Sequence, residues 1–303
     1  YRIEIIFAYR TFKWSSEATE KAAVHCVVIG FALNTYTGEK TIFATDSIPH
    51  KVDTINPYLI EAPNVFIHGR STPICTAPKI TYGNKPADGG NLILSEEEYK
   101  MLISEDSSVI PFVRRYVGSK DYINNDEIRY CLWLRDVPAN LYRKNNEIMR
   151  RLAAVKEMRL KSTAAPTRAM ADAPYKFFSA PQKEGDCLCI PEVSSERRKY
   201  IPMGFLKNGI IASNKLLILP DASIYHFGVL ISNVHMAWTR TVCGRLKSDY
   251  QYSGAIVYNN FPWPIPTEQQ KQRIEQTAQA ILDARALYPD SSLADLYDEL
   301  TMP

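Results

Sequence analysis

The stretch YSGAIVYNNFPWPIP (252–266) decides how the C-terminal part of this chain folds. Its first seven residues have the apolar character of a strand, two asparagines follow, and Phe261 and Trp263 then stand among three prolines. Aromatic side chains of this size are seldom left in a free linker, and proline fixes the backbone. We therefore expect Phe261 and Trp263 to be buried against a sheet, the prolines to set the exit direction of the chain, and Asn259 and Asn260 to satisfy the backbone groups of the turn.

The sequence on both sides of this stretch predicts a mixture of helices and strands. Thr267 and Gln270 form a capping box after Pro266, which predicts a helix that extends to about residue 287. This helix has one apolar stripe, made of Ile274, Ala278, Ile281 and Leu282. Residues 233–250 are expected to form a short helix and then a loop. Three apolar runs before them are predicted to be strands: CLCIPEV (187–193), NKLLILP (214–220) and ASIYHFGVLIS (222–232).

The N-terminal half begins with a predicted antiparallel hairpin. Residues 1–9 and 22–33 have strand character, and the second run is so continuously apolar that we expect it to be buried. Ser95 and Glu98 form a second capping box and predict a helix. Residues 127–136 are a further strand candidate. The fold class expected from these elements is α/β (α+β), with mixed and antiparallel sheets and packed helices.

One segment of the chain carries a strong positive charge. Between residues 143 and 161 there are seven Lys and Arg side chains against two Glu, whereas the whole 303-residue chain has a net charge of only +3. We expect residues 141–162 to form one helix whose apolar side chains recur every three or four positions, so that its other face is free for the charges. Such asymmetry indicates a face for a polyanion; the alternative is a solvated helix flank.

The composition is that of a globular protein without a membrane segment. The chain is 46% hydrophobic and 23% charged, and no run approaches the roughly 20 apolar residues of a membrane span. Arg2, Glu4 and Arg10 exclude a signal-peptide core at the start, and because the chain lacks an initial Met we expect it to be a fragment. Its six cysteines form no C-x-x-C pair and are expected to be reduced and mostly buried, in a cytoplasmic protein.

Two stretches suggest chemistry that we do not expect. INPYL (55–59) lacks one of the two prolines of the Asn-Pro-Pro-Tyr loop of adenine methyltransferases, so a simple Asn-Pro turn suffices. Asp88, Glu98 and Lys100 imitate the spacing of metal-dependent nucleases, but Glu98 falls in a capped helix rather than on a strand. The histidines show no metal-ligand spacing. The sequence therefore predicts no catalytic residue and no metal site in this chain.

Several stretches together resemble the C-terminal half of the MmeI-like type II (IIG/IIL) restriction–modification enzymes. They occur in order over almost the whole chain: FAYRTFKWSSEATEKAAVHCVVIGF, NPYLI, DGGNLILSEEE, RYCLWL, SSERRKYIPMGF, HFGVLISNVHMAW, CGRLKSDYQYS, YNNFPWP and LADLYDELTMP.

The resemblance implies a division of labour along the chain. Residues 1–33 would be the last strand hairpin of an adenine-N6 methyltransferase domain, 34–266 a DNA target recognition domain, and 267–303 a C-terminal helical segment. The methyltransferase and nuclease domains that complete the enzyme would lie upstream in the same polypeptide, together with the site for S-adenosylmethionine. The expected partner is double-stranded DNA.

A recognition domain of this kind would hold phosphates with Lys and Arg and distinguish base edges with amides, hydroxyls and cations. Our candidates for phosphate contacts are Arg143, Lys144, Arg150, Arg151, Lys156, Arg197, Arg198, Arg245 and Lys247. Base contacts should lie outside the shared motifs, because family members differ in target sequence. The candidates are Ser179, Gln182, Lys183, Lys207, Asn208, Ser213, Asn214 and Lys215. Phe12 or Trp14 would stack on a flipped base; either could equally be a core aromatic.

Two other functions are compatible with the sequence. The chain could be a non-catalytic scaffold whose basic helix contacts a protein or an anionic surface, or a nuclease built around Glu98 and Lys100. DNA recognition predicts duplex binding that weakens steeply with salt. The scaffold predicts no preference for duplex DNA, and the nuclease predicts metal-dependent cleavage that is lost in Lys100→Ala.

Overall fold

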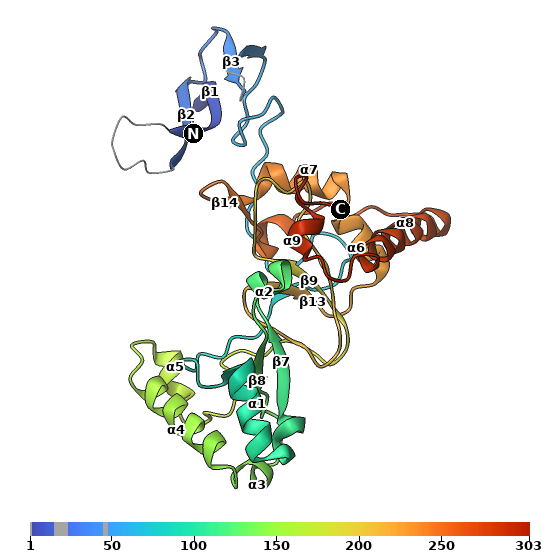
Figure 1. Cartoon of the computed structure of the whole chain (residues 1–303). Coiled ribbons are helices and arrows are strands. Elements are labelled where there is room, and N and C mark those ends of the chain that lie inside the picture. The colour runs from blue at the N-terminus through green and yellow to red at the C-terminus, as the bar shows by residue number, and fades with distance from the viewer. Residues whose placement is uncertain (1, 15–23, 45–47) are drawn as a thin grey trace.

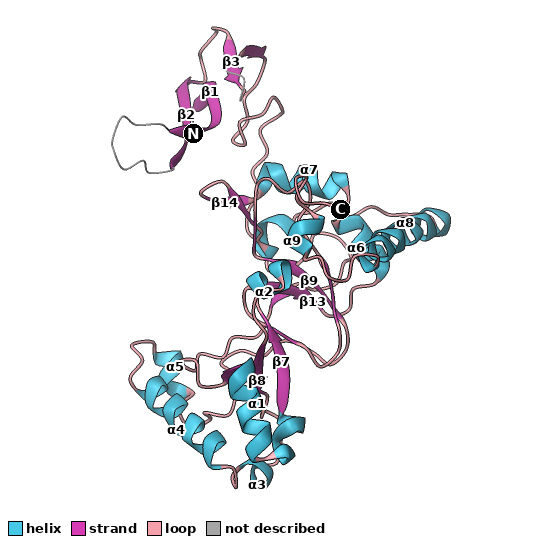
Figure 2. Ribbon diagram, viewed as in Figure 1, coloured by secondary structure: helices cyan, strands magenta, loops and turns pink. Residues whose placement is uncertain are grey.

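The computed structural model describes residues 2–14, 24–44 and 48–303, and Figure 1 shows them as three lobes in a row. The N-terminal lobe holds the first strands, the central lobe most of the C-terminal half, and the distal lobe residues 84–180. Figure 2 shows β7 (Val113–Val117) and β8 (Arg129–Leu132) extending from the distal lobe toward the central lobe. The expected α/β class, with several small sheets and packed helices, is confirmed.

The N-terminal lobe is a four-stranded sheet in the order β2-β1-β3-β4. Its strands are β1 (Ile3–Trp14), β2 (Val24–Leu33), β3 (Lys40–Phe43) and β4 (Pro49–Val52). The predicted antiparallel hairpin is confirmed as the β1–β2 pair, although its expected loop lies outside the described residues. The expected burial of the second strand is wrong: Phe31 is 66% and Leu33 64% exposed, and β2 is also the edge strand of this sheet.

The distal lobe is a sheet covered by helices, with strand order β12-β7-β8-β6. β6 (Ile93–Ser95) leads into α1 (Glu96–Glu105), whose predicted capping box is present: Ser95 Oγ accepts from the Glu98 N–H at 3.2 Å and Glu98 Oε2 accepts from the Ser95 N–H at 2.9 Å. The other helical segments of this lobe are the 3₁₀ segment η1 (Ser107–Phe112), α3 (Ala139–Tyr142), α4 (Asn146–Leu160) and α5 (Ala165–Ala169). α2 (Ser119–Asn124) follows β7 and packs on the central lobe (Figure 1).

The single basic helix predicted over 141–162 is in fact two helices. α3 ends at Tyr142 and α4 starts at Asn146, because Asn145 caps the new helix: its Oδ1 accepts from the Ile148 N–H at 2.9 Å. An asparagine competes for backbone hydrogen bonds and so favours a helix start over a helix interior. Arg143 and Lys144 thus lie in a turn rather than on a helix face.

The central lobe combines two small sheets with helices. One sheet has the order β11-β9-β13-β5 and the other β10-β15-β14. Its strands are β5 (Thr81–Tyr82), β9 (Cys187–Pro191), β10 (Val193–Ser194), β11 (Gly204–Leu206), β13 (Leu216–Leu219), β14 (Gly244–Leu246) and β15 (Asp249–Gln251). Its helices are α6 (Ile224–Leu230), α7 (Asn233–Val242), the π-helical turn η2 (Gly254–Tyr258), α8 (Glu268–Ala286) and α9 (Leu293–Leu296). β12 (Ile211–Ala212) leaves this lobe to join the distal sheet.

Three predictions in this lobe are wrong, and two of them concern short apolar runs. The run 222–232 contains the helix α6 rather than a strand, and residues 254–258 form η2. The third is the loop expected after the helix of residues 233–242, which contains the polar β14–β15 hairpin. A run buried on all sides lacks the period that separates a helix from a strand. The signal available for α6 was its capping box, in which His226 Nδ1 accepts from the Ser223 N–H at 2.9 Å.

The FPWP segment is buried as expected, but mainly against helices. Trp263, 7% exposed, packs edge-on against His226 of α6, and Phe261, 2% exposed, packs edge-on against His235 of α7. Asn260 donates through Nδ2 to the carbonyls of His68, Ala255 and Ile256. The segment therefore fastens the linker near residue 68 to the central lobe.

The C-terminal helix α8 packs closely on α6. The predicted capping box of Thr267 and Gln270 is present. Ala278 is 1% exposed, and a Cβ added to Gly228 of α6 would lie 2.8 Å from Ile274 Cγ2 and 3.0 Å from Ala278 Cβ. The predicted apolar stripe therefore faces α6 at a distance that only glycine permits. Within the described ranges, no helix combines the length and apolar character needed to cross a bilayer.

Candidate nucleic-acid interface

The arginines of α4 that lie on its inner face are structural. Arg159 is fully buried and its guanidinium donates to five backbone carbonyls at 2.7–3.0 Å: those of Pro86, Ala87, Met170, Ala173 and Lys176. The side chain of Arg151 is 7% exposed and forms ion pairs with Glu98 at 2.6 Å and Glu147 at 2.8 Å. Arg151, expected to contact phosphate, is therefore enclosed and already paired.

The position of these two arginines could have been predicted from their spacing. The buried residues of α4 are Ile148, Arg151, Leu152, Val155 and Arg159. Steps of three and four residues place all of them on one face. Because the segment is basic overall, all of its cations were expected on the solvent face, whereas Arg151 and Arg159 lie on the apolar face.

The remaining basic residues near α4 are exposed. Arg150 pairs with Glu147 at 2.7 Å, and Lys156 pairs with Asp172 at 3.0 Å. Hydrogen bonds from Arg150 lower the pKa of Glu147 to about 2, so this carboxylate is charged at any physiological pH. Arg143 and Lys144 are exposed in the α3–α4 turn. Much of the apparent excess of positive charge is thus neutralised locally.

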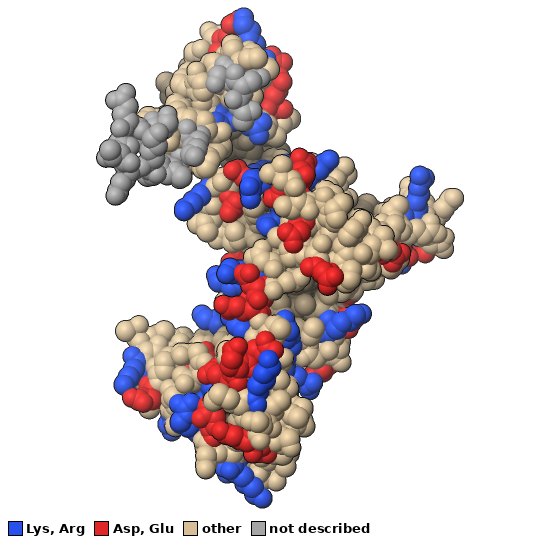
Figure 3. Space-filling view, viewed as in Figure 1, with Lys and Arg blue, Asp and Glu red and all other residues tan. Residues whose placement is uncertain are grey.

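A large cleft lies between the N-terminal lobe and the β14–β15 hairpin. Its volume is about 1150 Å³. One wall is formed by β1 and β2 and includes Arg10, Phe12 and His25, and the other is formed by the β14–β15 turn and includes Arg245 and Lys247. Figure 3 shows Lys and Arg atoms on the concave edge of the molecule beside β14 and beside α2, with acidic side chains between them.

The β14–β15 turn presents two exposed cations to this cleft. Arg245 stacks on Tyr250, with its guanidinium carbon 3.9 Å from the ring centroid, and donates to the Ser248 carbonyl at 2.9 Å. Lys247 has a φ of +58°, which projects its exposed side chain from the apex of the two-residue turn. A Lys in this left-handed region is uncommon, and here the hairpin geometry imposes it.

The two predicted stacking residues differ in position. Phe12 is half-buried and lines the cleft. Trp14 is 54% exposed, its ring centroid lies 6.4 Å from that of Phe12, and it is not among the described residues that line the cleft. Of the two, Phe12 has the position required for contact with a base inside the cleft.

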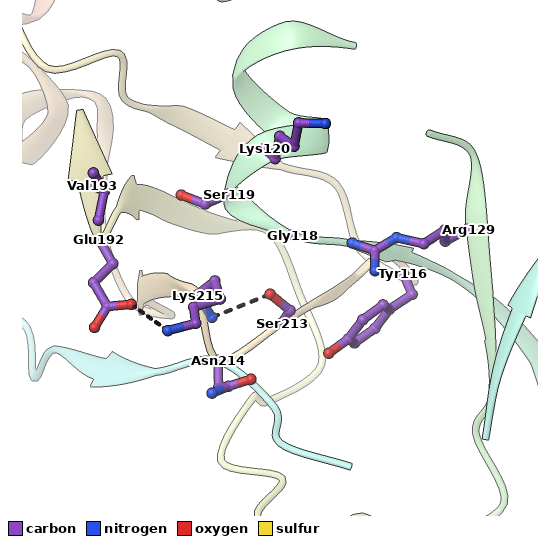
Figure 4. A pocket seen from close by; sticks show the side chains of 10 residues that line it. All are labelled: Tyr116, Gly118, Ser119, Lys120, Arg129, Glu192, Val193, Ser213, Asn214 and Lys215. Carbon is purple, nitrogen blue, oxygen red and sulfur yellow. Dashed lines mark hydrogen bonds and ion pairs between the residues drawn. The ribbon is translucent and has the colours of Figure 1, made fainter. Parts of the chain in front are cut away.

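A second, smaller cavity of about 410 Å³ lies between α2 and the turn that precedes β13 (Figure 4). Three of the predicted base-contact residues line it, namely Ser213, Asn214 and Lys215. The residues on its other side were not predicted from the sequence: Tyr116, Ser119, Lys120 and Arg129. No local cluster marks them, because it is the pairing of Tyr116 with Arg129 across β7 and β8 that brings them together.

The other predicted base-contact residues belong to two loops that hold each other. Lys207 forms an ion pair with Asp186 at 2.9 Å, and Asn208 Oδ1 accepts from the Gly185 N–H at 3.0 Å. Lys183 lies 3.4 Å from Asp221, and Ser179 is exposed. None of these four residues is among the described residues that line the cavity beside Ser213, Asn214 and Lys215.

Gln182 has a structural role in those loops. Its Oε1 accepts from Asn84 Nδ2 at 2.7 Å and from the Ala212 N–H at 2.9 Å, while its Nε2 donates to the Ile210 carbonyl at 2.7 Å. Each polar atom of the side chain therefore already has a partner within the protein. We remove Gln182 from the base-contact candidates.

The basic segment 143–159 and the segment 207–215 lie at opposite edges of the distal sheet. β12 (Ile211–Ala212), within the second segment, is at one edge of this sheet, and β6 is at the other. Arg151 of α4 donates to the carbonyls of Asn91 and Ile93, at the β6 edge. The two sets that the sequence predicted to share one surface are therefore divided between the two edges, and further cations lie beside β14 and beside α2 (Figure 3).

The remaining candidates and motifs have structural partners. Arg197 approaches Asp298 at 3.7 Å, and burial lowers the pKa of Arg198. Asp88 accepts from the Leu92 N–H at 2.5 Å, and Lys100 pairs with Glu96 rather than facing Glu98 across a metal site. Asn56 Oδ1 accepts from the Tyr58 N–H at 2.9 Å, as expected for a simple turn. In the described parts of the chain no group of His, Cys, Asp and Glu could hold a metal ion.

Comparison with known proteins relates these lobes to one enzyme family. The family model for the DNA-methyltransferase domain of MmeI matches residues 1–44, that for its target recognition domain residues 61–265, and that for its C-terminal domain residues 266–303. The boundary between the last two models falls between Ile265 and Pro266, just after the FPWP segment.

Two relatives match the chain over its full length. DNA methyltransferase A of Bacillus subtilis (strain 168) is 38% identical over 303 residues, which cover 34% of that protein. The solved structure of the type IIL restriction–modification enzyme MmeI in complex with DNA is 45% identical, with a TM-score of 0.92 over all of this chain and 41% of that one. The chain thus spans roughly a third to two fifths of the length of these relatives, and by the match over residues 61–265 it belongs to the MmeI target recognition domain family.

Proposed function

We propose that this chain recognises a specific sequence in double-stranded DNA for an adenine-N6 methyltransferase of a restriction–modification system. The observation that carries the proposal is the cleft of about 1150 Å³. One wall of the cleft, formed by β1 and β2, belongs to the segment that matches a methyltransferase domain. The other wall, formed by the β14–β15 turn, belongs to the segment that matches a target recognition domain. DNA held between them would be presented to a catalyst on the N-terminal side.

The proposal distributes the contacts along the concave edge. Arg245 and Lys247 hold phosphates at the cleft, while Asn214 and the exposed loop residues Ser179, Lys183, Lys207 and Asn208 contact base edges. Phe12 stacks on the base that is taken out of the duplex, a step that costs a few kcal/mol and must be offset by contacts elsewhere on the site. Arg143, Lys144, Arg150 and Lys156 are retained only as peripheral phosphate contacts.

The remainder of the enzyme is proposed to be supplied by a longer polypeptide. The exposed apolar side chains of β2, including Phe31 and Leu33, would pack against further strands of the methyltransferase sheet. That domain would bind S-adenosylmethionine and transfer its methyl group, and a nuclease domain would precede it. As part of a bacterial defence enzyme acting on DNA, the protein would be cytoplasmic.

The test is the salt dependence of duplex binding by the chain, measured by fluorescence anisotropy with a labelled 24-bp duplex. DNA recognition predicts that log Kd rises steeply and linearly with log salt. Lys247→Asn removes one cation while Asn tolerates the left-handed backbone, so it should lower the slope by about one. Lys100→Gln, on α1 and outside the cleft, is the matched control and should keep the wild-type slope. A scaffold protein would show no duplex binding that responds to salt in this way.

A further inference from the structure

The small cavity beside α2 has an arrangement that the proposed cleft does not explain. Three cations from different elements line it: Lys120 of α2, Arg129 of β8 and Lys215 of the turn before β13 (Figure 4). No single helix or strand therefore accounts for the cluster. Such convergence of positive charge from separate elements is typical of a site for an anion.

The two lysines at the rim each have one ion-pair partner. Lys120 pairs with Asp126 at 2.9 Å with 76% of its side chain exposed. An exposed pair of this kind is worth about 0–1 kcal/mol, so an incoming anion can displace Asp126 at little cost. Lys215 is 67% exposed and pairs at 3.2 Å with Glu192, which is 18% exposed and also lines the cavity. An ammonium has three N–H donors, so Lys215 can keep this pair and contact a ligand as well.

The inner wall of the cavity is fixed. Asp121 accepts from the Gly118 N–H at 2.9 Å and from Arg129, and this pair ties the start of α2 to β8. Arg129 also lies over the Tyr116 ring, 5.6 Å from its centroid. Within the described residues, the hydroxyl of Ser119 is enclosed and has no hydrogen-bond partner. A polar atom in this state is usually completed by a ligand or water.

We propose that this cavity binds a phosphodiester of the DNA backbone, with Lys120 and Lys215 on either side of it and the Ser119 hydroxyl donating to a phosphate oxygen. Arg129 is a positioning residue that fixes α2. This assignment rests on the proposed function, because it takes the anion from the same duplex. The site would set the register of the duplex next to Asn214, since phosphate contacts position a protein while base contacts specify the sequence.

The experiment compares variants of the full chain in the anisotropy assay. Lys120→Gln and Lys215→Gln should each lower the salt slope by about one, because each removes one phosphate contact. Ser119→Ala removes a neutral donor, so it should weaken binding while keeping the wild-type slope. Lys100→Gln serves again as the exposed-lysine control.

The possible outcomes separate the two proposals. Wild-type slopes in both Lys120→Gln and Lys215→Gln would overturn the phosphate site and leave the proposed function intact, whereas wild-type protein that shows no salt-dependent duplex binding would overturn both. A shallower slope in Lys100→Gln would also overturn the site, because any exposed lysine would then suffice. Calorimetric titration with AMP should show no saturable binding; saturable binding that Lys120→Gln abolishes would assign the cavity to a free nucleotide instead.

Discussion

At the scale of single residues, the role of a basic side chain depends on whether it lies on the buried or the exposed face of its helix. Arg159 and Arg150 occur in the same basic run, yet the first is fully buried and the second has 64% of its side chain exposed. Arg159 donates to carbonyls in two separate segments, 86–87 and 170–176, and so holds both against α4. Burial lowers its pKa, which is consistent with a charge kept inside by hydrogen bonds.

Arg159→Met is therefore expected to destabilise the chain by about 3 kcal/mol or more, because several buried carbonyls lose their donor. The measurement is the free energy of unfolding from urea titration. Arg150→Met is the matched control and should change that free energy by no more than about 0.5 kcal/mol, as is usual at exposed positions. Equal effects of the two substitutions would contradict the structural assignment.

His235 makes the stability of the central lobe depend on pH. It is 1% exposed, its Nε2 lies 3.1 Å from the hydroxyl of Tyr252, and burial lowers its pKa to about 4. Between this value and the ordinary His pKa near 6.5, the unfolded chain binds more protons than the folded one. Stability should therefore rise with pH through this window and fall as the pH drops toward 4.

The expected loss from this one group between pH 7 and pH 4 is about 3 kcal/mol. Urea unfolding at several pH values, compared with His235→Asn, measures it: the variant should show a flatter pH dependence, since every other titrating group is shared. Parallel curves for the two proteins would show that His235 is not the cause.

At the scale of elements, the sequence predicted the helices that begin with a capping box and the strands that are clear apolar runs. The capping boxes at Ser95 and Thr267 placed α1 and α8 correctly, and the apolar runs placed β9 and β13. It did not predict α6 or η2, because a short run buried on all sides has no period to distinguish helix from strand. The break between α3 and α4 depended on one asparagine within an otherwise continuous pattern.

The FPWP segment is expected to stabilise the helices on both sides of it. Trp263 contacts His226, Tyr258 and Phe261, and so connects α6, η2 and the start of α8. Trp263→Ala should lower the free energy of unfolding by roughly 3 kcal/mol or more, as is usual for deletion of a buried aromatic. Thermal unfolding of the two proteins measures this, and a negligible shift in Tm would show that the segment is not a brace.

At the scale of the whole molecule, the interface is created by contacts between segments distant in sequence. The cleft joins β1 and β2 to a turn more than 200 residues later, and the cavity beside α2 joins residues near 119 and 129 to residues near 214. The charge distribution in the sequence indicated a polyanion partner. It also suggested that the cations that contact this partner lie mainly in the basic segment 143–159, which has the largest local charge. Only the fold shows that this helix lies at the other edge of the distal sheet.

The central claim is that DNA binds along the concave edge rather than on α4. Amide hydrogen exchange of the chain, with and without a saturating duplex at low salt, tests this claim most directly. The account predicts slower exchange at the β14–β15 turn (244–251) and around residues 118–120, with a much smaller change at residues 143–161, where only peripheral phosphate contacts are proposed. Protection confined to 143–161, with none at 244–251, would contradict it.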